Sequence, residues 1–337
     1  MPAKVFIDGA AGTTGLEIRE RLADRGELEL LQLAESERKS TRARREALNE
    51  ADLVILCLPD EAAREAAAMV ENPSVRIIDA STAHRTDPDW AFGFPELEPG
   101  QRERIAAAKR VSNPGCYSTG FLALARPLVR AGMLPADFPV TVNAVSGYSG
   151  GGKSMIEEFE ARESPRYVET VARTYGLTLA HKHVPEMQKH SGLSHPPLFS
   201  PIVGRFYRGM IVEVPLQLWA LPGKPTVFDL YLALGEAYKG EKLVEVAEFD
   251  ASMEALRAYR EGRPLPPRKW EPSAPLQTLD AEMLKHSNGM KLFVFGNDKT
   301  QQARLVAVLD NLGKGAAGAA VQNLNLMLGL PETTGLL

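Results

Sequence analysis

Short apolar runs alternate with helical patterns through the first third of the chain. Four apolar runs have the length of strands and cover residues 4–9, 27–33, 51–60 and 75–81. Between them, apolar residues recur at helical spacing in 16–26 and 61–70. The run at 51–60 is apolar at nearly every position, as a strand of a buried parallel sheet requires. This alternation predicts an α/β fold with a doubly wound, Rossmann-type sheet.

The pattern changes after residue 140, where the regular alternation of strand and helix stops. Residues 208–220, 290–298 and 303–311 have the pattern of antiparallel strands, and 250–262 that of a helix. We therefore expect a second, α+β domain built on a mixed sheet. A large sheet with one apolar face commonly pairs with a copy of itself, so a homo-oligomer, a dimer or a tetramer, is expected. A last helix is predicted at 316–329, with small residues on one side.

A glycine-rich turn, GAAGTTG, joins the first predicted strand to the first helix and has its glycines at Gly9, Gly12 and Gly15. Such a turn lets a pyrophosphate approach the helix N-terminus, where free N–H groups and the helix dipole favour an anion. The spacing departs from G-x-G-x-x-G, and a plain strand–turn–helix junction is the alternative. Because strand ends face the ligand crevice in such sheets, we also expect Pro59 and Ser81 near a dinucleotide.

The segment after the second strand, AESERKSTRARR, bears on the choice of cofactor. An acidic residue there, here Glu35, would accept a hydrogen bond from the ribose hydroxyl of NAD. Ser36, Arg38 and Lys39 favour the 2′-phosphate of NADP instead, and a solvated charged helix face is a third interpretation. The sequence favours NADP without settling the question.

Composition and charge exclude several classes of function. The 337 residues carry a net charge of -4, which gives no electrostatic case for nucleic acid as the main partner. No apolar run approaches the ~20 residues of a membrane span. The N-terminus enters a strand pattern directly, without a signal peptide, and there are 2 cysteines. We therefore expect a cytoplasmic enzyme without disulfides.

Cys116 is the candidate nucleophile. It follows Pro114 and Gly115 and precedes an apolar helix, so it lies at a helix N-terminus, where a thiol pKa is lowered. Beside a nicotinamide domain, a thiolate would take an activated acyl group as a thioester, which hydride reduces to an aldehyde. The alternative is a small buried residue at a turn. Cys57 lies inside an apolar strand and is expected to be an inert core residue.

The stretch HKHVPEMQKH supplies the acid and base that this chemistry requires. His181 and His183 would share one face of a strand, with Glu186 close by. A surface histidine pair is the alternative, and no third ligand suggests a metal, so none is expected. In the stretch DASTAHRTD, Ser81 and Arg85 would suit an anion at the crevice, with a structural salt bridge as the alternative for Arg85.

One stretch also fits the phosphate-binding pattern G-x-x-x-x-G-K-[ST], namely GYSGGGKS at 147–154. A true phosphate-binding loop lies at the first strand–helix junction of its own nucleotide domain, which GAAGTTG already occupies here. We therefore expect this match not to bind ATP, and expect Gly150 to Gly152 to let the backbone approach a substrate closely.

Taken together, the chain resembles the N-acetyl-gamma-glutamyl-phosphate reductases, in their shorter form. The resemblance covers nearly the full length, and its most specific parts are SNPGC and DNLGKGAAGAAVQN. The matching stretches are GAAGTTG, DLVILCLPD, IDASTAHRTDPDWAFGFPEL, SNPGCYSTG, SGYSGGGKS, HKHVPEM and VLDNLGKGAAGAAVQNLNLMLGLPETTGL.

The resemblance implies a role for individual residues. Cys116 would be acylated, and either His183 or His181 would be the acid/base. Ser81, Arg85 and Asn113 match positions that bind the substrate phosphate in the wider semialdehyde-dehydrogenase group. The remaining assignments are Ser146, Gly147 and Glu186 at the substrate, and Gly9, Gly12, Thr13, Thr14, Gly15, Pro59, Asn311 and Gly313 at the cofactor.

The resemblance also implies a domain division and an activity. Residues 1–115 and 312–337 would form the NADP-binding domain, and 116–311 the catalytic and oligomerisation domain. The activity would be NADPH-dependent reduction of N-acetyl-gamma-glutamyl phosphate, an acyl phosphate of arginine biosynthesis. Aspartate-semialdehyde dehydrogenase is the alternative of the same class. A P-loop phosphotransferase and a catalytically dead regulator are the alternatives from other classes.

Overall fold

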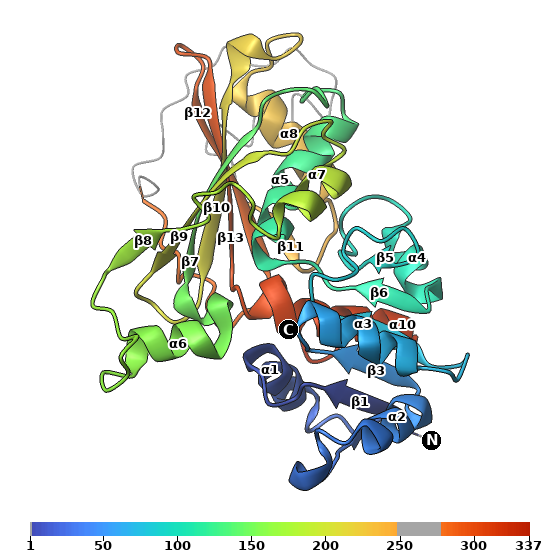
Figure 1. Cartoon of the computed structure of the whole chain (residues 1–337). Coiled ribbons are helices and arrows are strands. Elements are labelled where there is room, and N and C mark those ends of the chain that lie inside the picture. The colour runs from blue at the N-terminus through green and yellow to red at the C-terminus, as the bar shows by residue number, and fades with distance from the viewer. Residues whose placement is uncertain (1, 248–277) are drawn as a thin grey trace.

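The structure, a computed structural model, describes residues 2–247 and 278–337. The helix predicted at 250–262 lies outside these residues. The described chain builds two separate sheets, one in each lobe of the molecule (Figure 1). Within it, no helix is long and apolar enough to cross a membrane.

The first sheet has six strands in the order β2-β1-β3-β4-β6-β5, and every pair is parallel. Its strands are β1 (Ala3–Asp8), β2 (Leu28–Leu31), β3 (Leu53–Leu56), β4 (Arg76–Asp79), β5 (Ala91–Phe92) and β6 (Arg110–Ser112). The four strands predicted from the apolar runs are thus confirmed. The order reverses between β1 and β3, which makes the glycine turn after β1 the place where such sheets bind a ligand.

Alternate side chains of these strands enter two different cores, which explains why the strands are apolar throughout. On one face, Val5 and Ile55 pack with Ile18 of α1 and with the C-terminal helix α10. On the other, Phe6 and Val54 pack with α2 and α3. The helices of this lobe are α1 (Thr13–Leu22), α2 (Thr41–Glu50), α3 (Asp60–Met69) and α4 (Gln101–Ala107), with a short turn η1 (Glu35–Glu37).

The second sheet has seven strands in the order β11-β12-β13-β10-β7-β9-β8. It is mixed, since β7 and β9 are parallel whereas β10, β12 and β13 pair antiparallel. The strands are β7 (Thr141–Gly147), β8 (Ala172–Thr174), β9 (Leu198–Gly204), β10 (Met210–Gln217), β11 (Val244–Val246), β12 (Met290–Asn297) and β13 (Gln302–Leu309). The predicted mixed sheet and its three antiparallel strands are confirmed.

Three helices cover one face of this sheet (Figure 1). They are α5 (Cys116–Arg130), α7 (Val184–Ser191) and α8 (Val227–Ala237). The first of them, α5, buries a continuous apolar stripe, including Phe121 and Leu124, against β10 and β13. The short helix α6 (Gly152–Glu160) follows the turn η2 (Tyr148–Gly151) and packs near α1, whereas the turn η3 (Leu218–Ala220) follows β10.

The chain returns to the first sheet at its C-terminal end. After β13, a π-helical turn η4 (Gly313–Ala317) leads into α10 (Gly318–Met327), which packs against α1, α4 and β4. Lys314 of this turn is fully buried and pairs with Glu96 at 2.8 Å, while Gln322 of α10 bonds to both. The turn is therefore held firmly where the two lobes meet.

Candidate active site

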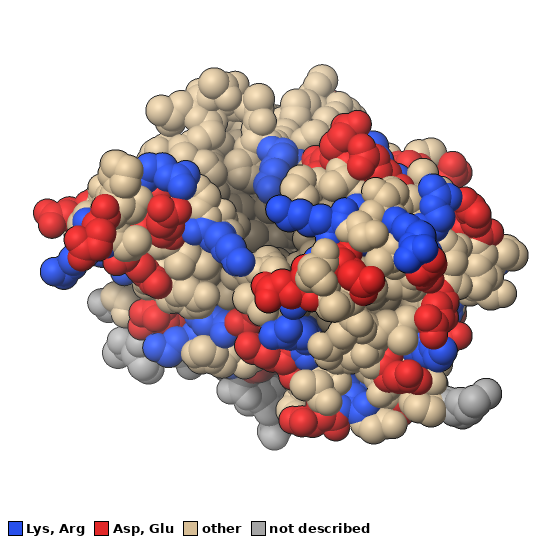
Figure 2. Space-filling model, turned by 60° about the horizontal axis from the view of Figure 1, so that its bottom comes forward, with Lys and Arg blue, Asp and Glu red and all other residues tan. Residues whose placement is uncertain are grey.

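A cavity of about 570 Å³ opens between the two lobes. Its walls come from the glycine turn, from the loops after β3 and β4, from the start of α5 and from the segment before α7. In Figure 2 the molecule is hollowed between its lobes, with Lys and Arg side chains at the rim. The sequence-predicted residues that line the cavity are Gly12, Thr13, Thr14, Gly15, Arg85, Asn113, Cys116, Ser146, Gly147, His181, His183 and Asn311.

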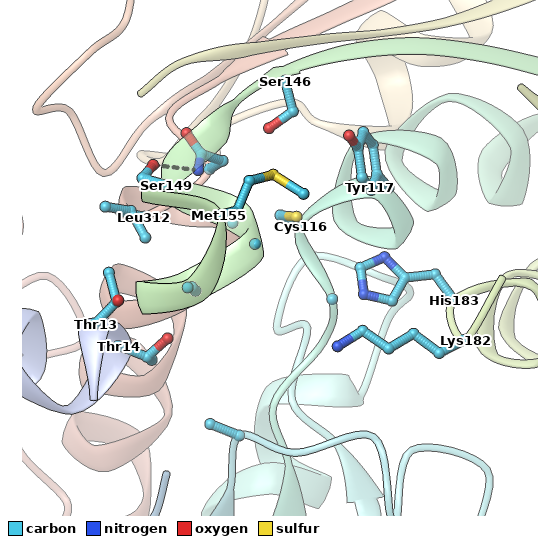
Figure 3. A pocket seen from close by; sticks show the side chains of 18 of the residues that line it. Thr13, Thr14, Cys116, Tyr117, Ser146, Ser149, Met155, Lys182, His183 and Leu312 are labelled. Atoms are coloured by element: carbon cyan, nitrogen blue, oxygen red, sulfur yellow. Dashed lines mark hydrogen bonds between the residues drawn. The ribbon is translucent and has the colours of Figure 1, made fainter. Parts of the chain in front are cut away.

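Cys116 is the first residue of α5, as predicted, and stands at the centre of this cavity (Figure 3). The chain before it is tightly enclosed. A Cβ on Gly115 would lie 2.5 Å from Nη1 of Arg85 and 2.6 Å from both Oε1 of Glu186 and Cε1 of His183. These three side chains therefore surround the residue that precedes the cysteine, and glycine is required there because any side chain would collide with them.

The prediction that the helix start lowers the Cys116 pKa is wrong for this structure. Burial raises the pKa of the thiol to about 11, although Arg85, the backbone N–H of Tyr117 and Lys182 act in the opposite direction. Desolvation of the charged form thus outweighs the favourable charges. The cysteine therefore rests as a neutral thiol at pH 7.

This resting state predicts how Cys116 responds to pH. Its alkylation by iodoacetamide in the free protein should accelerate about tenfold per pH unit from pH 7 to pH 10, because only the thiolate reacts. The rate is measured by mass spectrometry of the peptide that contains Cys116. A rate that levels off below about pH 8 would show a thiol that ionises near its ordinary pKa.

His181 and His183 do not lie in a strand, so that prediction is wrong. They stand in a turn after β8, and His183 is the residue before the first turn of α7. The backbone N–H of His183 donates to Nδ1 of His181 at 3.1 Å, and the two rings meet edge to face, 4.8 Å apart. The turn brings both rings to the cavity.

His183 is the better placed of the two for proton transfer with Cys116. Its ring lies beside the start of α5 (Figure 3), and among the described residues its buried Nδ1 has no hydrogen-bond partner. Burial, reinforced by Arg85 and His181, holds the pKa of His183 well below its ordinary value. Burial likewise lowers the pKa of His181 to about 4. Both imidazoles are therefore neutral at pH 7.

Arg85 and Glu186 form a buried ion pair beneath the cysteine. Nη1 of Arg85 lies 2.7 Å from Oε1 of Glu186, whose other oxygen accepts the backbone N–H of Gly115 at 3.1 Å. The guanidinium also donates to the carbonyl oxygens of Asn113 and Ala80. Glu186 does not line the cavity, and the pair fixes the position of Gly115 and thereby of Cys116.

Several other predicted residues are engaged within the protein. The Ser81 hydroxyl donates to Asp79 at 2.7 Å and does not line the cavity. The Asn113 amide bonds to the carbonyl of Ala316 and to Asn323 of α10. Pro59 precedes α3 outside both large cavities, and Gly313 packs against the backbone of Ser287. Of these predicted residues, only Asn113 lines the cavity.

The prediction for Cys57 is only partly right, because this residue packs against the core of the first lobe but also lines the cavity. β3 ends at Leu56, and Cys57 is half-buried on the wall of the cavity that the nucleotide-binding lobe supplies. Burial raises the pKa of its thiol to about 12. It therefore borders the site as an unreactive thiol.

The loop that fits the phosphate-binding pattern is built into the same cavity. Ser146 and Gly147 end β7, and Gly150 to Lys153 line the cavity through η2 and the start of α6. Asn311 holds this loop, since its amide donates to the Ser149 hydroxyl at 2.9 Å and accepts the N–H of Gly209. The Ser154 hydroxyl, which would hold Mg²⁺ in a true phosphate-binding loop, accepts a hydrogen bond from Arg166 instead.

The loop should therefore not bind ATP. No Asp or Glu is among the residues that line this cavity, so a Mg²⁺–ATP complex finds no carboxylate there. Isothermal titration calorimetry with ATP and Mg²⁺ is expected to show no saturable heat. Micromolar binding that Lys153→Ala abolishes would overturn this interpretation.

A second cavity, of about 400 Å³, lies at the carboxyl ends of β1 and β2. Gly9 borders it with φ +91°, and Arg38, Lys39 and Arg44 stand on its outer wall. Arg44 forms a salt bridge with Asp8, in which Nη2 lies 2.7 Å from Oδ2. Ser36 does not line the cavity. Both cavities border the glycine turn, and this arrangement fits a dinucleotide with its adenosine in the second cavity and its nicotinamide in the first.

The sequence did not point to four other residues of the cavity. Tyr175 donates to the Tyr117 hydroxyl at 3.1 Å, and both rings pack around His181. Gly315 of η4 approaches so closely that a Cβ there would lie 2.8 Å from Cβ of Cys116. Lys182, between the two histidines, also lines the cavity. The available signals were the position of Tyr117 next to Cys116 and that of Lys182 within the HKH triplet, and Tyr175 and Gly315 had no such signal.

Among the described residues, no cluster of His, Cys, Asp and Glu side chains is placed to hold a metal ion.

Two family models match the chain. Residues 4–108 match the semialdehyde dehydrogenase NAD-binding domain, and 116–311 match the semialdehyde dehydrogenase dimerisation domain. N-acetyl-gamma-glutamyl-phosphate reductase 2 of Nostoc sp. is 52% identical over 337 residues, covering 99% of each chain. N-acetyl-gamma-glutamyl-phosphate reductase of Brucella ovis is 54% identical over 330 residues, covering 98% of this chain and all of the relative.

Two solved structures with a similar fold are aspartate semialdehyde dehydrogenases. Aspartate semialdehyde dehydrogenase II of Vibrio cholerae, complexed with ASA, has a TM-score of 0.70 at 17% identity and covers 98% of this chain and 99% of its own. The enzyme of Candida albicans with NADP has a TM-score of 0.59 at 13% identity and covers 97% of this chain and 99% of its own. At such identities the likeness concerns the fold alone.

Proposed function

The chain belongs to the semialdehyde dehydrogenase family and, within it, to the N-acetyl-gamma-glutamyl-phosphate reductases, and on that premise we propose how its residues carry out this reaction. The substrate is N-acetyl-gamma-glutamyl phosphate and the products are N-acetylglutamate 5-semialdehyde and phosphate. The observation that carries the proposal is Cys116 at the start of α5, beside His183, in one cavity with the glycine turn.

The first half of the reaction forms a thioester. The Cys116 sulfur attacks the acyl carbon, the new S–C bond forms, and the C–O bond to phosphate breaks with its electron pair on the phosphate oxygen. His183, which is neutral and has a free buried Nδ1, accepts the thiol proton and passes it to the leaving phosphate. The Arg85–Glu186 pair holds Gly115, so the sulfur keeps its place.

The second half releases the aldehyde. When bound, the nicotinamide cofactor supplies the hydride that reduces the thioester carbon. The carbonyl then reforms as the S–C bond breaks, and the thiolate regains a proton from solvent through His183. The glycine turn at Gly12 to Gly15 and the loop at Gly150 to Gly152 would hold the cofactor, because they form the walls beside Cys116. The proposed division places the cofactor on 1–115 with 312–337 and the catalytic residues on 116–311.

We propose NADP as the cofactor. Arg38 and Lys39 border the adenosine cavity, whereas Glu35 does not and its side chain is 91% exposed. Nη1 of Arg38 lies 3.9 Å from Oε1 of Glu35, which is a long and therefore weak ion pair. The two cations thus border the place that a 2′-phosphate would occupy, and the carboxylate that would favour NAD is not part of the cavity lining.

The cofactor preference should be lost in an Arg38→Ala/Lys39→Ala variant. Charge-assisted hydrogen bonds are worth about 1.5–3 kcal/mol each, so NADP selectivity should fall about tenfold to several hundredfold. The measurement compares kcat/KM for NADPH and NADH. Arg42→Ala is the matched control, since Arg42 is 86% exposed and lies outside the cavity. Equal use of both cofactors by the wild type, or an unchanged ratio in the double variant, would refute the assignment.

The family match and the free cysteines also bear on the oligomeric state and the cellular location of the enzyme. We propose a homo-oligomer, supported by the match of residues 116–311 to a dimerisation domain. A cytoplasmic location is supported by Cys57 and Cys116, which are both free thiols.

The experiment that tests the function compares two substrates in the oxidative direction. The wild type should reduce NADP⁺ with N-acetylglutamate 5-semialdehyde plus phosphate, and should do so far less well with aspartate semialdehyde plus phosphate. A preference for aspartate semialdehyde would assign the chain to the enzymes that share its fold.

A further inference from the structure

The cavity around Cys116 is built for anions. Arg85, Lys153 and Lys182 line it, and among the described residues that form its walls there is no carboxylate. Under the function proposed above, the substrate brings a phosphate group bonded to the reacting carbon and a carboxylate at the other end of its chain. The question is which cation receives the phosphate.

The residues that resemblance assigns to the phosphate are already engaged. The Arg85 guanidinium is neutralised by Glu186 at 2.7 Å and donates to two backbone carbonyls. The Asn113 amide ties the loop to Ala316 and Asn323. The Ser81 hydroxyl donates a hydrogen bond to the Asp79 carboxylate. Binding a dianion through these groups alone would require breaking buried contacts, which is costly.

Lys182 differs from them in two respects. Its ammonium makes no hydrogen bond or ion pair within 2–247 and 278–337. Its side chain runs from the turn before α7 beneath His183 into the cavity (Figure 3). The position is close enough to Cys116 for the positive charge to act on the thiol, as the charge of Arg85 does. Lys153 stands on α6, which packs against α1, so it belongs to the side of the glycine turn.

We propose that Lys182 binds the phosphate group of the substrate, a role that rests on the proposed function. The phosphate oxygen is bonded to the carbon that Cys116 attacks, and the carboxylate is at the other end of the substrate. A cation close to Cys116 is therefore placed to contact the phosphate and not the carboxylate. As the C–O bond breaks, negative charge grows on the leaving phosphate, and the ammonium stabilises it. In the reverse direction the same lysine holds free phosphate for attack on the thioester.

The test measures each KM in the oxidative direction with NADP⁺. Lys182→Met should raise the KM for phosphate about 10- to 100-fold. Lys182→Arg keeps the positive charge, so its KM for phosphate should stay close to that of the wild type. The KM for N-acetylglutamate 5-semialdehyde should change less than about twofold. Lys189→Met is the matched control, because Lys189 lies on α7, which begins just after Lys182, but bonds to the Thr86 carbonyl outside the cavity.

An unchanged phosphate KM in Lys182→Met would overturn the proposal. A raised semialdehyde KM with an unchanged phosphate KM would also overturn it, and would assign Lys182 to the carboxylate. Calorimetry with inorganic phosphate and the NADP-bound protein gives a second readout that needs no turnover. Wild type should bind phosphate more tightly than Lys182→Met, and equal affinities would refute the role. A wild type that cannot oxidise the semialdehyde would refute the proposed function, while the calorimetry would still test Lys182.

Discussion

Cys116→Ser is expected to lower kcat/KM by at least about 10³-fold. A serine hydroxyl has a far higher pKa than a thiol, is a weaker nucleophile, and would form an ester where the mechanism requires a thioester. The substitution replaces one small atom at the first position of α5, so the fold and cofactor binding should survive. Steady-state kinetics, a thermal melt and a titration with NADPH measure the three quantities.

Cys57→Ser is the matched control for this prediction. Cys57 lines the other wall of the same cavity as a half-buried thiol, and no step requires it. Its loss should change kcat/KM less than about tenfold, a small effect beside removal of a nucleophile. A Cys116→Ser enzyme that retains activity within tenfold of wild type would exclude the thioester route.

His183→Asn is expected to lower kcat by about 10²–10⁴-fold, the usual contribution of a general acid/base. Because the pKa of Cys116 is raised to about 11, a base must take the thiol proton during attack. His183 lies against Gly115, and its Nδ1 has no partner among the described residues. The KM values should change much less than kcat.

His181→Asn is the matched comparison. Nδ1 of His181 accepts the backbone N–H of His183 and so holds the turn. An asparagine oxygen would preserve this role, so kcat should fall less than about tenfold. A larger loss for His181→Asn than for His183→Asn would reverse the assignment of the base.

The sequence predicted the first sheet well because its strands are buried on both faces. Val5 and Phe6 enter different cores, and such strands leave a nearly unbroken apolar run that is easily recognised. The position of Cys116 was predicted for a similar local reason, since Pro114 and Gly115 precede an apolar helix. The raised pKa was not predicted, because the burial that causes it comes from η4, α7 and the loop after β7, which are distant in sequence.

The histidine turn was predicted wrongly although a local signal existed. A spacing of two residues suits a strand, but Pro185 stands in the first turn of α7, where proline is common in helices. That proline indicates a helix beginning at Val184, which leaves His183 as its preceding residue. The engagement of Asn113 by Asn323 had no such signal, since only the folded chain brings the two together.

The central claim is that Cys116 carries the N-acetylglutamyl group, and mass spectrometry tests it most directly. Wild-type enzyme is mixed with N-acetylglutamate 5-semialdehyde and NADP⁺ without phosphate, so that the thioester forms and has no acceptor. The account predicts one N-acetylglutamyl group on the peptide that contains Cys116, released when phosphate is added. An unmodified Cys116 peptide while NADPH is formed, or an acyl group on another residue, would contradict it.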